Sequence, residues 1–204
     1  SIVRQNERHI KRADQGPVHI ERLSLTTRIP TELLKLDGTS GKAIEMTFNQ
    51  RTFCIISYVT VLVIGLMIFS DFGVSWDELY HLEYGEVVFN HIFKGYPLVT
   101  SGDQIFYGPF FDLSAHILMK AFRLEDIRSI LLGKHLITFL YFWVALFFFY
   151  KLCRSYFGSW LPAYIACLFL VIHPRILAES FYNPKDLPFL SMFVVGCFTL
   201  QWYL

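Results

Sequence analysis

Two adjacent carboxylates, Asp77 and Glu78, follow an almost wholly apolar segment and stand between Trp76 and Tyr80. Such a pair at the end of a membrane span has two ordinary uses. It can begin a helix, because Ser75 and Glu78 have the S-x-x-E spacing of a capping box and the helix dipole favours an acid in the first turn. It can also provide a general base for a reaction at the membrane face. The residues leave both interpretations open for Asp77, whereas Glu78 has a sufficient local role as the partner of Ser75.

A second group of ionisable side chains follows the third apolar run. Asn183 as the N-cap, Pro184 at the first helical position and Asp186 in the first turn would begin the next helix. Arg175 and Glu179 have no such local use, and ionisable residues at membrane depth are candidates for function. This segment is therefore expected either to start a helix only or to contribute to a polar site as well.

A metal site is the third chemistry to weigh, with His81, His91 and His116 beside Asp112 or Glu83. His81 and Glu83 are two positions apart, so they point away from each other on a helix and are poor joint ligands. No cofactor is predicted, and a divalent metal has no support from these residues. The four cysteines show neither C-x-x-C spacing nor a histidine partner, so they predict no disulfide or zinc site. They are Cys54, Cys153, Cys167 and Cys197.

The elements that position these residues are membrane spans. The composition is 54% hydrophobic, 18% aromatic and only 17% charged, and the mean hydropathy is +0.42, which is typical of an integral membrane protein. Four apolar runs are long enough, or nearly so, to cross about 30 Å of hydrocarbon at about 1.5 Å per residue. They are residues 53–70, 129–150, 160–177 and 187–204, of which the third is interrupted at His173-Pro174.

The loop 71–128 contains a fifth segment, Tyr107–Phe122, in which Gly108-Pro109 breaks the chain just before the expected helix. It is too short to cross a membrane, and its polar side chains recur at helical spacing on one face, so we expect an amphipathic helix in the interface. Its polar residues are Asp112, His116 and Lys120. The Lys134-His135 pair lies near the end of the second span, from which both side chains are expected to reach the interface.

The orientation follows from the positive charges Arg51, Lys151 and Arg154, which predict a cytoplasmic N-terminus and a cytoplasmic second loop. The acidic loop 71–128 and the connection 173–186 then share the other side. The net charge of +1 is unevenly spread, which informs topology and gives no reason to expect a nucleic-acid partner.

The chain is expected to divide into a polar extension, residues 1–52, and a membrane domain, residues 53–204. Met46 is a plausible native start, because the residues before it are polar and lack the apolar core of a signal peptide. The sequence ends inside an apolar run, so we expect a chain truncated after the fourth span.

Together these motifs resemble the N-terminal part of the GT-C fold glycosyltransferases that use polyprenyl-phosphate-linked sugars. The resemblance is greatest to the branch of protein O-mannosyltransferases and aminoarabinose transferases, which is like glycosyltransferase family 39. It covers residues 50–204 and rests on the order of four features: the Asp-Glu pair after the first span, an amphipathic loop helix, Tyr-Gly-Pro-Phe-Phe at 107–111, and HP…ES.YNPKD at 173–186.

The resemblance implies an all-α, multi-span, GT-C-like bundle that transfers a sugar, with inversion, to a lipid, glycan or protein acceptor on the non-cytoplasmic face. By position, Asp77 would be the general base with Glu78 beside it, and Asp186 would match the second acidic residue. Lys185 stands where related sequences often have Arg, and it would offer positive charge to the donor phosphate. Further candidates for donor or substrate binding are Arg175, Glu179 and Tyr107.

The membrane would be the bacterial inner membrane, or that of the endoplasmic reticulum in a eukaryote. Family members have more spans than this chain, so residues 50–204 alone are expected to be inactive. The alternative is a non-enzymatic multi-span protein, such as a portion of a transporter or an assembly subunit, in which the acids only cap helices. Inverted-repeat symmetry with broken spans would favour a transporter.

Overall fold

The computed structural model describes residues 46–100 and 104–204, which belong to one compact unit, 42–204, and whose regular elements are all helical. Most of the predicted extension 1–52 lies outside the described residues, so its boundary and the start at Met46 stay predictions. The helices are α1 (Phe48–Ile68), η2 (Phe69–Asp71), α2 (Glu78–Lys94), η3 (Gln104–Phe106), α3 (Phe110–Ala121), α4 (Ile127–Phe157), α5 (Trp160–Ile172), α6 (Pro174–Tyr182) and α7 (Asp186–Tyr203).

Two helical segments are long and apolar enough to cross a membrane: α1 with η2, which has 24 residues, and α4, which has 31. They coincide with the first two predicted spans and have the length and apolar composition expected of them. The third predicted span is bent, because α5 and α6 meet at an angle of 66° and count as one crossing only if the broken pair spans together. α7 covers the fourth predicted span but is not one of these helices, so its crossing stays a prediction.

The bend between α5 and α6 occurs at His173, whose backbone is extended (φ −68°, ψ 115°). The residue before a proline is pushed out of the helical region by the proline ring, and Pro174 then serves as the first residue of α6. The His173 side chain accepts a hydrogen bond from the Ile176 amide at 3.4 Å, which caps the new helix. The interruption expected from the sequence is therefore real, and it redirects the chain toward α7.

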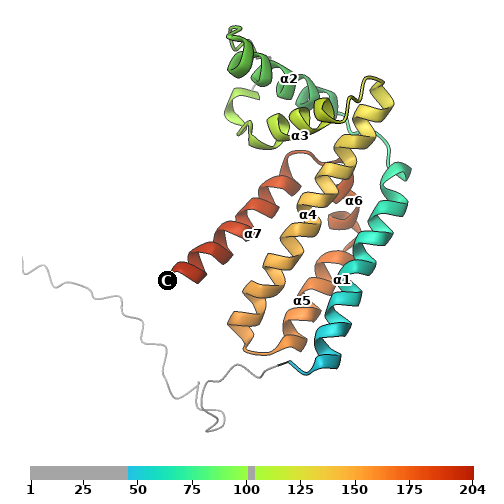
Figure 1. The fold of residues 1–204 in the computed structure, drawn as a ribbon, viewed down its shortest axis with the longest axis vertical. Coiled ribbons are helices and arrows are strands. Elements are labelled where there is room, and N and C mark those ends of the chain that lie inside the picture. Colours follow the sequence, from blue (N-terminus) through green and yellow to red (C-terminus); the bar gives the residue numbers. More distant parts are fainter. Residues whose placement is uncertain (1–45, 101–103) are drawn as a thin grey trace, which may run out of the picture. The chain divides into compact units, whose positions relative to one another are not determined.

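α4 is the central helix, and α3, α5, α6 and α7 all pack against it (Figure 1). Its Phe139 is fully buried and stacks on Phe181 of α6, with ring centroids 4.9 Å apart. Phe72, in the segment before α2, stacks on the other face of Phe181 at 4.3 Å. Aromatic contacts of this kind add to the burial of large apolar surfaces. The stack thus fixes the chain just before Asp77 against the end of α6.

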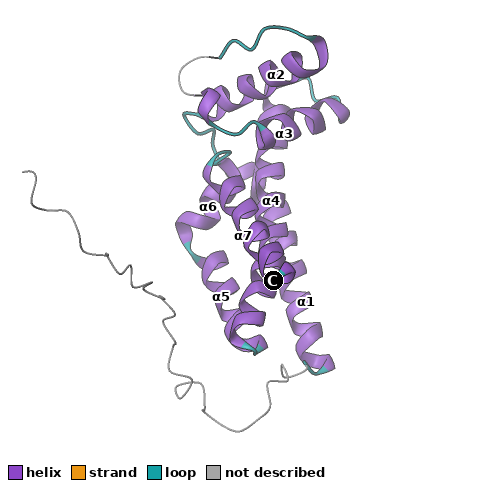
Figure 2. Cartoon of the chain, turned by 90° about the vertical axis from the view of Figure 1, so that its left-hand side faces the viewer, coloured by secondary structure: helices purple, strands orange, loops and turns teal. Residues whose placement is uncertain are grey.

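α2 and α3 form a pair of helices that pack against each other at the end of α1 where that helix finishes (Figure 2). Close approach requires Gly85, because a Cβ there would lie 2.6 Å from the Asp112 carbonyl oxygen. The 12 residues of α3 are about 18 Å long at 1.5 Å per residue, less than the hydrocarbon thickness of about 30 Å. The structure confirms a short helix in this loop, and neither α2 nor α3 is among the described helices that are long and apolar enough to cross a membrane.

Candidate active site

The two acidic segments singled out in the sequence lie side by side. The Ser75 hydroxyl is 2.8 Å from Asp77 Oδ1 and 3.1 Å from the carbonyl oxygen of Tyr182, at the end of α6. Ser75 has a single hydroxyl proton, so it either donates one hydrogen bond shared between the two oxygens or bonds to one of them at a time. Ser75 therefore links the loop that contains Asp77 to the connection that leads to Lys185 and Asp186.

Asp77 is the residue before the first turn of α2, not a member of that turn as the sequence suggested. Its backbone carbonyl accepts from the His81 amide at 3.2 Å, but its side chain caps no backbone N–H. The predicted capping box is only half formed. Glu78 Oε2 accepts from the Ser75 amide at 3.2 Å, whereas the Ser75 hydroxyl is directed to Asp77 and Tyr182 instead of the Glu78 amide. The partly exposed Asp77 carboxylate is thus available for chemistry.

Lys185 stands over the ring of Tyr107, with Nζ 3.9 Å from the ring centroid, a cation–π arrangement. Contact with the Tyr107 side chain raises the pKa of Lys185, and the negative charges of Asp186 and Asp77 raise it further. The Tyr107 carbonyl accepts from the Tyr84 hydroxyl at 3.2 Å, which ties this loop to α2. The candidate residues Asp77, Lys185 and Tyr107 are therefore neighbours.

Asp186 is exposed and is held by its own turn. Asn183 Oδ1 accepts from the Lys185 and Asp186 amides at 3.1 and 2.8 Å, and Asn183 Nδ2 donates to Asp186 Oδ2 at 3.1 Å. The prediction that Asn183 is the N-cap and Pro184 the first helical residue is wrong, because α7 begins at Asp186 with Lys185 as its N-cap. Asn183 instead accepts hydrogen bonds from the amides at the start of α7 from two positions before the cap. Asp186 is available at the surface, but its carboxylate already has a local partner.

Arg175 and Glu179 form an ion pair one turn apart on α6, with Nε to Oε1 at 2.7 Å. The Arg175 side chain is 79% exposed, so this ion pair lies at the surface. No local role could be predicted for these two residues, and the structure provides one in their pairing. Their pairing does not prevent Arg175 from meeting an anion, because a guanidinium has five N–H donors.

A buried polar cluster lies beneath this surface and joins α2, α3 and α4. Glu78 is 1% exposed and its Oε1 is 3.0 Å from His135 Nε2. Asp112, 4% exposed, contacts Lys134 Nζ at 3.2 Å and His81 Nδ1 at 2.8 Å. These five residues will be called the buried cluster.

The buried cluster corrects two expectations. Lys134 and His135 do not extend to the interface, because both side chains are 1% exposed and lie among carboxylates. Glu78 is more than the partner of Ser75, since removing a charged partner from a buried pair is costly. The signal available in the sequence was the presence of five ionisable residues on apolar helices, but their pairing depends on how α2 and α3 cross the start of α4.

His116 is buried on α3 with its ring beside Phe89, the centroids 5.2 Å apart. Burial lowers the pKa of His116, and the nearby positive charge of Lys120 lowers it further. His91 is exposed, and its Nδ1–H donates to the Tyr96 carbonyl oxygen, 2.7 Å away. Among the residues that the structure describes, no three His, Cys, Asp or Glu side chains gather closely enough to hold a metal ion.

The geometry therefore offers a carboxylate, Asp77, and an ammonium, Lys185, on one partly exposed surface above a buried, charge-paired support. That combination can accept a proton from a nucleophile and neutralise an anion beside it. Comparison of the chain with protein-family models, with curated proteins and with solved structures finds no match.

Proposed function

We propose that this chain contributes the catalytic face of a membrane glycosyltransferase whose donor is a sugar linked to a polyprenyl phosphate. The observation that carries the proposal is the Ser75 hydroxyl, which lies between Asp77 and the Tyr182 carbonyl and so brings the first acidic segment next to Lys185. The acceptor would be a lipid, glycan or protein on the non-cytoplasmic side. The same juxtaposition is what the resemblance to GT-C enzymes requires.

The reaction assigns separate work to the two charged groups. Asp77 takes the proton from the acceptor hydroxyl or amine while that atom forms a bond to the anomeric carbon. The bond from the anomeric carbon to the phosphate oxygen breaks, and its electron pair leaves with the polyprenyl phosphate, which Lys185 neutralises. Attack opposite the leaving group inverts the anomeric centre. Tyr107 holds the Lys185 ammonium over its ring.

Glu78 has a different role in this mechanism. It is buried, it accepts from the Ser75 amide, and it pairs with His135, so it cannot meet an acceptor without leaving the buried cluster. We therefore assign Glu78 as a positioning residue that holds Ser75 and, through it, Asp77. Arg175, with Glu179 beside it, and Asp186 are placed at the exposed rim, where they would contact the sugar or phosphate.

A non-enzymatic membrane protein is the second candidate, and the buried cluster favours it. Glu78 is paired with His135, and Asp112 with Lys134 and His81, inside the described residues, as expected of polar groups that join helices and do no chemistry. On that alternative Asp77 and Lys185 would be surface groups of the loop. The two candidates make different predictions for Lys185: the enzyme would bind a phosphate-bearing donor through it, and the non-enzymatic protein would not.

The test uses membranes that contain the complete product of the gene, supplied with a polyprenyl-phosphate-linked sugar. Transfer is measured as a function of donor concentration in the parent and in Lys185→Gln. Loss of a charge-assisted contact worth about 1.5–3 kcal/mol should raise the donor KM about 10- to 100-fold. Lys94→Gln, which removes another exposed lysine at the far end of α2, is the matched control and should leave the KM unchanged.

Equal donor KM values in Lys185→Gln and the parent would remove Lys185 from the site. Absence of transfer by the parent with every donor tried, in membranes where the protein is inserted and folded, would favour the non-enzymatic alternative. Folding is followed by the thermal melting of the purified protein, because a variant that melts like the parent has kept its helices packed.

A further inference from the structure

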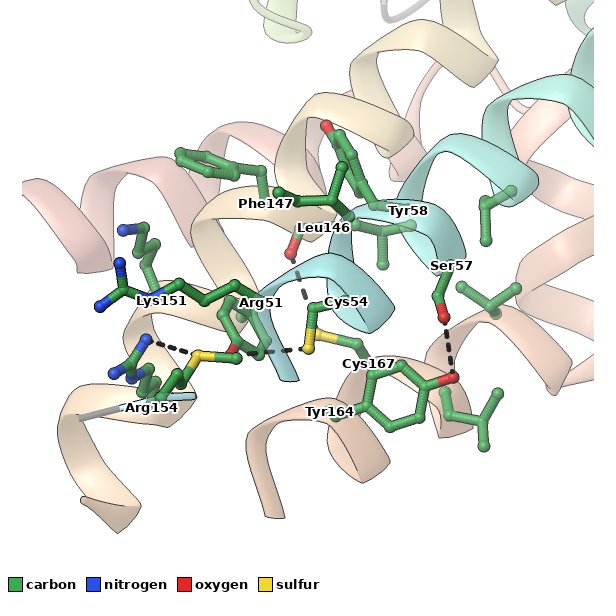
Figure 3. Close-up of a pocket in the computed structure, with 16 residues that line it drawn as sticks. Arg51, Cys54, Ser57, Tyr58, Leu146, Phe147, Lys151, Arg154, Tyr164 and Cys167 are labelled. Atoms are coloured by element: carbon green, nitrogen blue, oxygen red, sulfur yellow. Dashed lines mark hydrogen bonds between the residues drawn. The ribbon is translucent and has the colours of Figure 1, made fainter. Parts of the chain in front are cut away.

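A cavity lies at the other end of the spans, where α1 begins and α4 ends. It has a volume of about 600 Å³ and is lined by residues of α1, α4 and α5 (Figure 3). Cavities that bind small molecules in proteins have volumes of about 300–1,000 Å³. This cavity is separate from the candidate active site. Asp77 comes after the end of α1 and Lys185 directly before α7, whereas the cavity lies where α1 begins.

The cavity is long in the direction of the helices. Along α1 its lining runs from Arg51 to Val61, about 15 Å at 1.5 Å per residue, and along α4 it runs from Arg154 to Leu146, about 12 Å. The inner part of its wall is apolar, with side chains such as Val61, Leu146 and Val171. It therefore extends through about half of a hydrocarbon layer of about 30 Å.

The outer end of the cavity is positively charged. Arg51, Lys151 and Arg154 gather there, and Figure 3 shows the three side chains grouped at the same end. The lining residues include no Asp or Glu, and within the described residues none of the three cations forms an ion pair. Arg154 Nη1 contacts the Met46 sulfur at 2.8 Å, a weak acceptor that leaves the cation uncompensated.

These charges lie at the depth of a lipid headgroup. Arg51 is in the first turn of α1 and Arg154 in the last turn of α4, so both stand at the ends of membrane-spanning helices. The three cations are also those that predict the cytoplasmic side, where anionic lipids are concentrated. Basic pockets between spans on that side are suited to lipid phosphates.

We propose that this cavity binds an anionic phospholipid, with its phosphate among Arg51, Lys151 and Arg154 and one acyl chain along the apolar wall between α1, α4 and α5. The charge selects an anion, and the length and apolar character of the wall select a ligand with a hydrocarbon chain. A free phosphate would leave the wall empty, and the ammonium of a zwitterionic lipid would cancel the charge of its phosphate beside the three cations. The binding does not depend on glycosyl transfer.

The experiment measures lipid adducts of the purified full chain in mild detergent by native mass spectrometry, with phosphatidylglycerol and phosphatidylcholine as probes. Phosphatidylglycerol should bind at least tenfold more tightly. Removing all three cations in Arg51→Gln/Lys151→Gln/Arg154→Gln should weaken it about 100-fold, since each basic side chain near a lipid surface is worth about a fivefold change. The matched control is a triple substitution to Gln at the exposed cations Lys120, Arg123 and Arg128, and it should change the affinity less than threefold.

The role of the apolar wall is tested separately with Val61→Phe, which narrows the cavity and keeps its charges. Phosphatidylglycerol binding should fall at least tenfold, and millimolar inorganic phosphate should not displace the lipid from the parent. Equal affinity for the two lipids, normal binding by Val61→Phe, or displacement by phosphate would each overturn the proposal. Should the triple variant fail to fold, Lys151→Gln alone, at an exposed position, must still weaken binding about fivefold.

Discussion

Asp112→Asn should be among the most destabilising single substitutions in this protein. The carboxylate is 4% exposed and serves two buried partners, Lys134 Nζ at 3.2 Å and His81 Nδ1 at 2.8 Å. An amide of the same shape removes the negative charge and turns an N–H₂ group toward one of the two donors. Lys134, whose side chain is 1% exposed, then loses the carboxylate with which it forms its ion pair.

The size of the effect follows from this burial. Removing one partner of a buried ion pair costs about 3–5 kcal/mol, because the remaining charge is uncompensated. A loss of that size is a large fraction of the 5–15 kcal/mol that stabilises a typical folded chain. The free energy of unfolding is measured in mixed micelles of mild detergent and dodecyl sulfate, with helix content followed by circular dichroism.

A double variant separates the ion pair from the general loss of packing. Asp112→Leu combined with Lys134→Met replaces both charges by apolar groups, and such replacements are often neutral or stabilising. It should recover at least about 2 kcal/mol relative to Asp112→Leu alone, although His81 still loses its acceptor, at about 1–3 kcal/mol. Arg175→Gln, which breaks an exposed pair, should have no measurable effect. A cost below about 1 kcal/mol for Asp112→Asn, or strict additivity in the double variant, would refute the reasoning.

Three further predictions concern the support beneath the site. Gly85→Ala should lower the free energy of unfolding by about 1–3 kcal/mol in the same assay, since its Cβ would overlap the Asp112 backbone and separate α2 from α3. An unchanged stability would contradict the close packing of those helices. Burial lowers the pKa of His116, so the unfolded chain binds the proton more tightly than the folded chain, and stability that is complete above about pH 6.5 is lost as the pH falls below that value. His116→Gln should flatten this pH dependence in unfolding curves taken from pH 7.5 to 5. An equal loss of stability at low pH in the variant and the parent would assign the effect to other groups. Glu78→Gln should lower both stability and any transferase kcat while leaving the acceptor KM unchanged, because the single amide oxygen cannot accept from both the Ser75 amide and His135 as the two carboxylate oxygens do. A fully stable variant with parent kcat would leave Glu78 with only a capping role.

The helices were predictable where the local sequence is sufficient. Apolar runs of span length fixed α1 and α4, and Pro174 fixed the bend because a proline acts on the residue directly before it. Gly108 and Pro109 likewise marked the start of α3 at Phe110. Because α3 is too short to cross, Asp77 and Lys185 could be expected on the same side before any contact was known.

The pairing of side chains between helices was not predictable in the same way. Lys134 and His135 lie near the start of α4, and sequence alone permits them to turn outward. Whether they do depends on α2 and α3, which place Glu78 and Asp112 against them. The role of Glu78 was underestimated for the same reason, since the S-x-x-E spacing explained it locally and concealed its contact with His135, 57 positions away.

The transfer rate of Asp77→Asn at saturating donor and acceptor tests the central proposal most directly. General-base catalysis contributes about 10²- to 10⁴-fold, so kcat should fall by that factor while membrane insertion and thermal melting stay those of the parent. Glu83→Gln, which removes an exposed carboxylate from α2, is the matched control and should keep the full rate. A parent-like kcat in Asp77→Asn would contradict the account, because Glu78 and Asp112 are buried and cannot take the proton in its place.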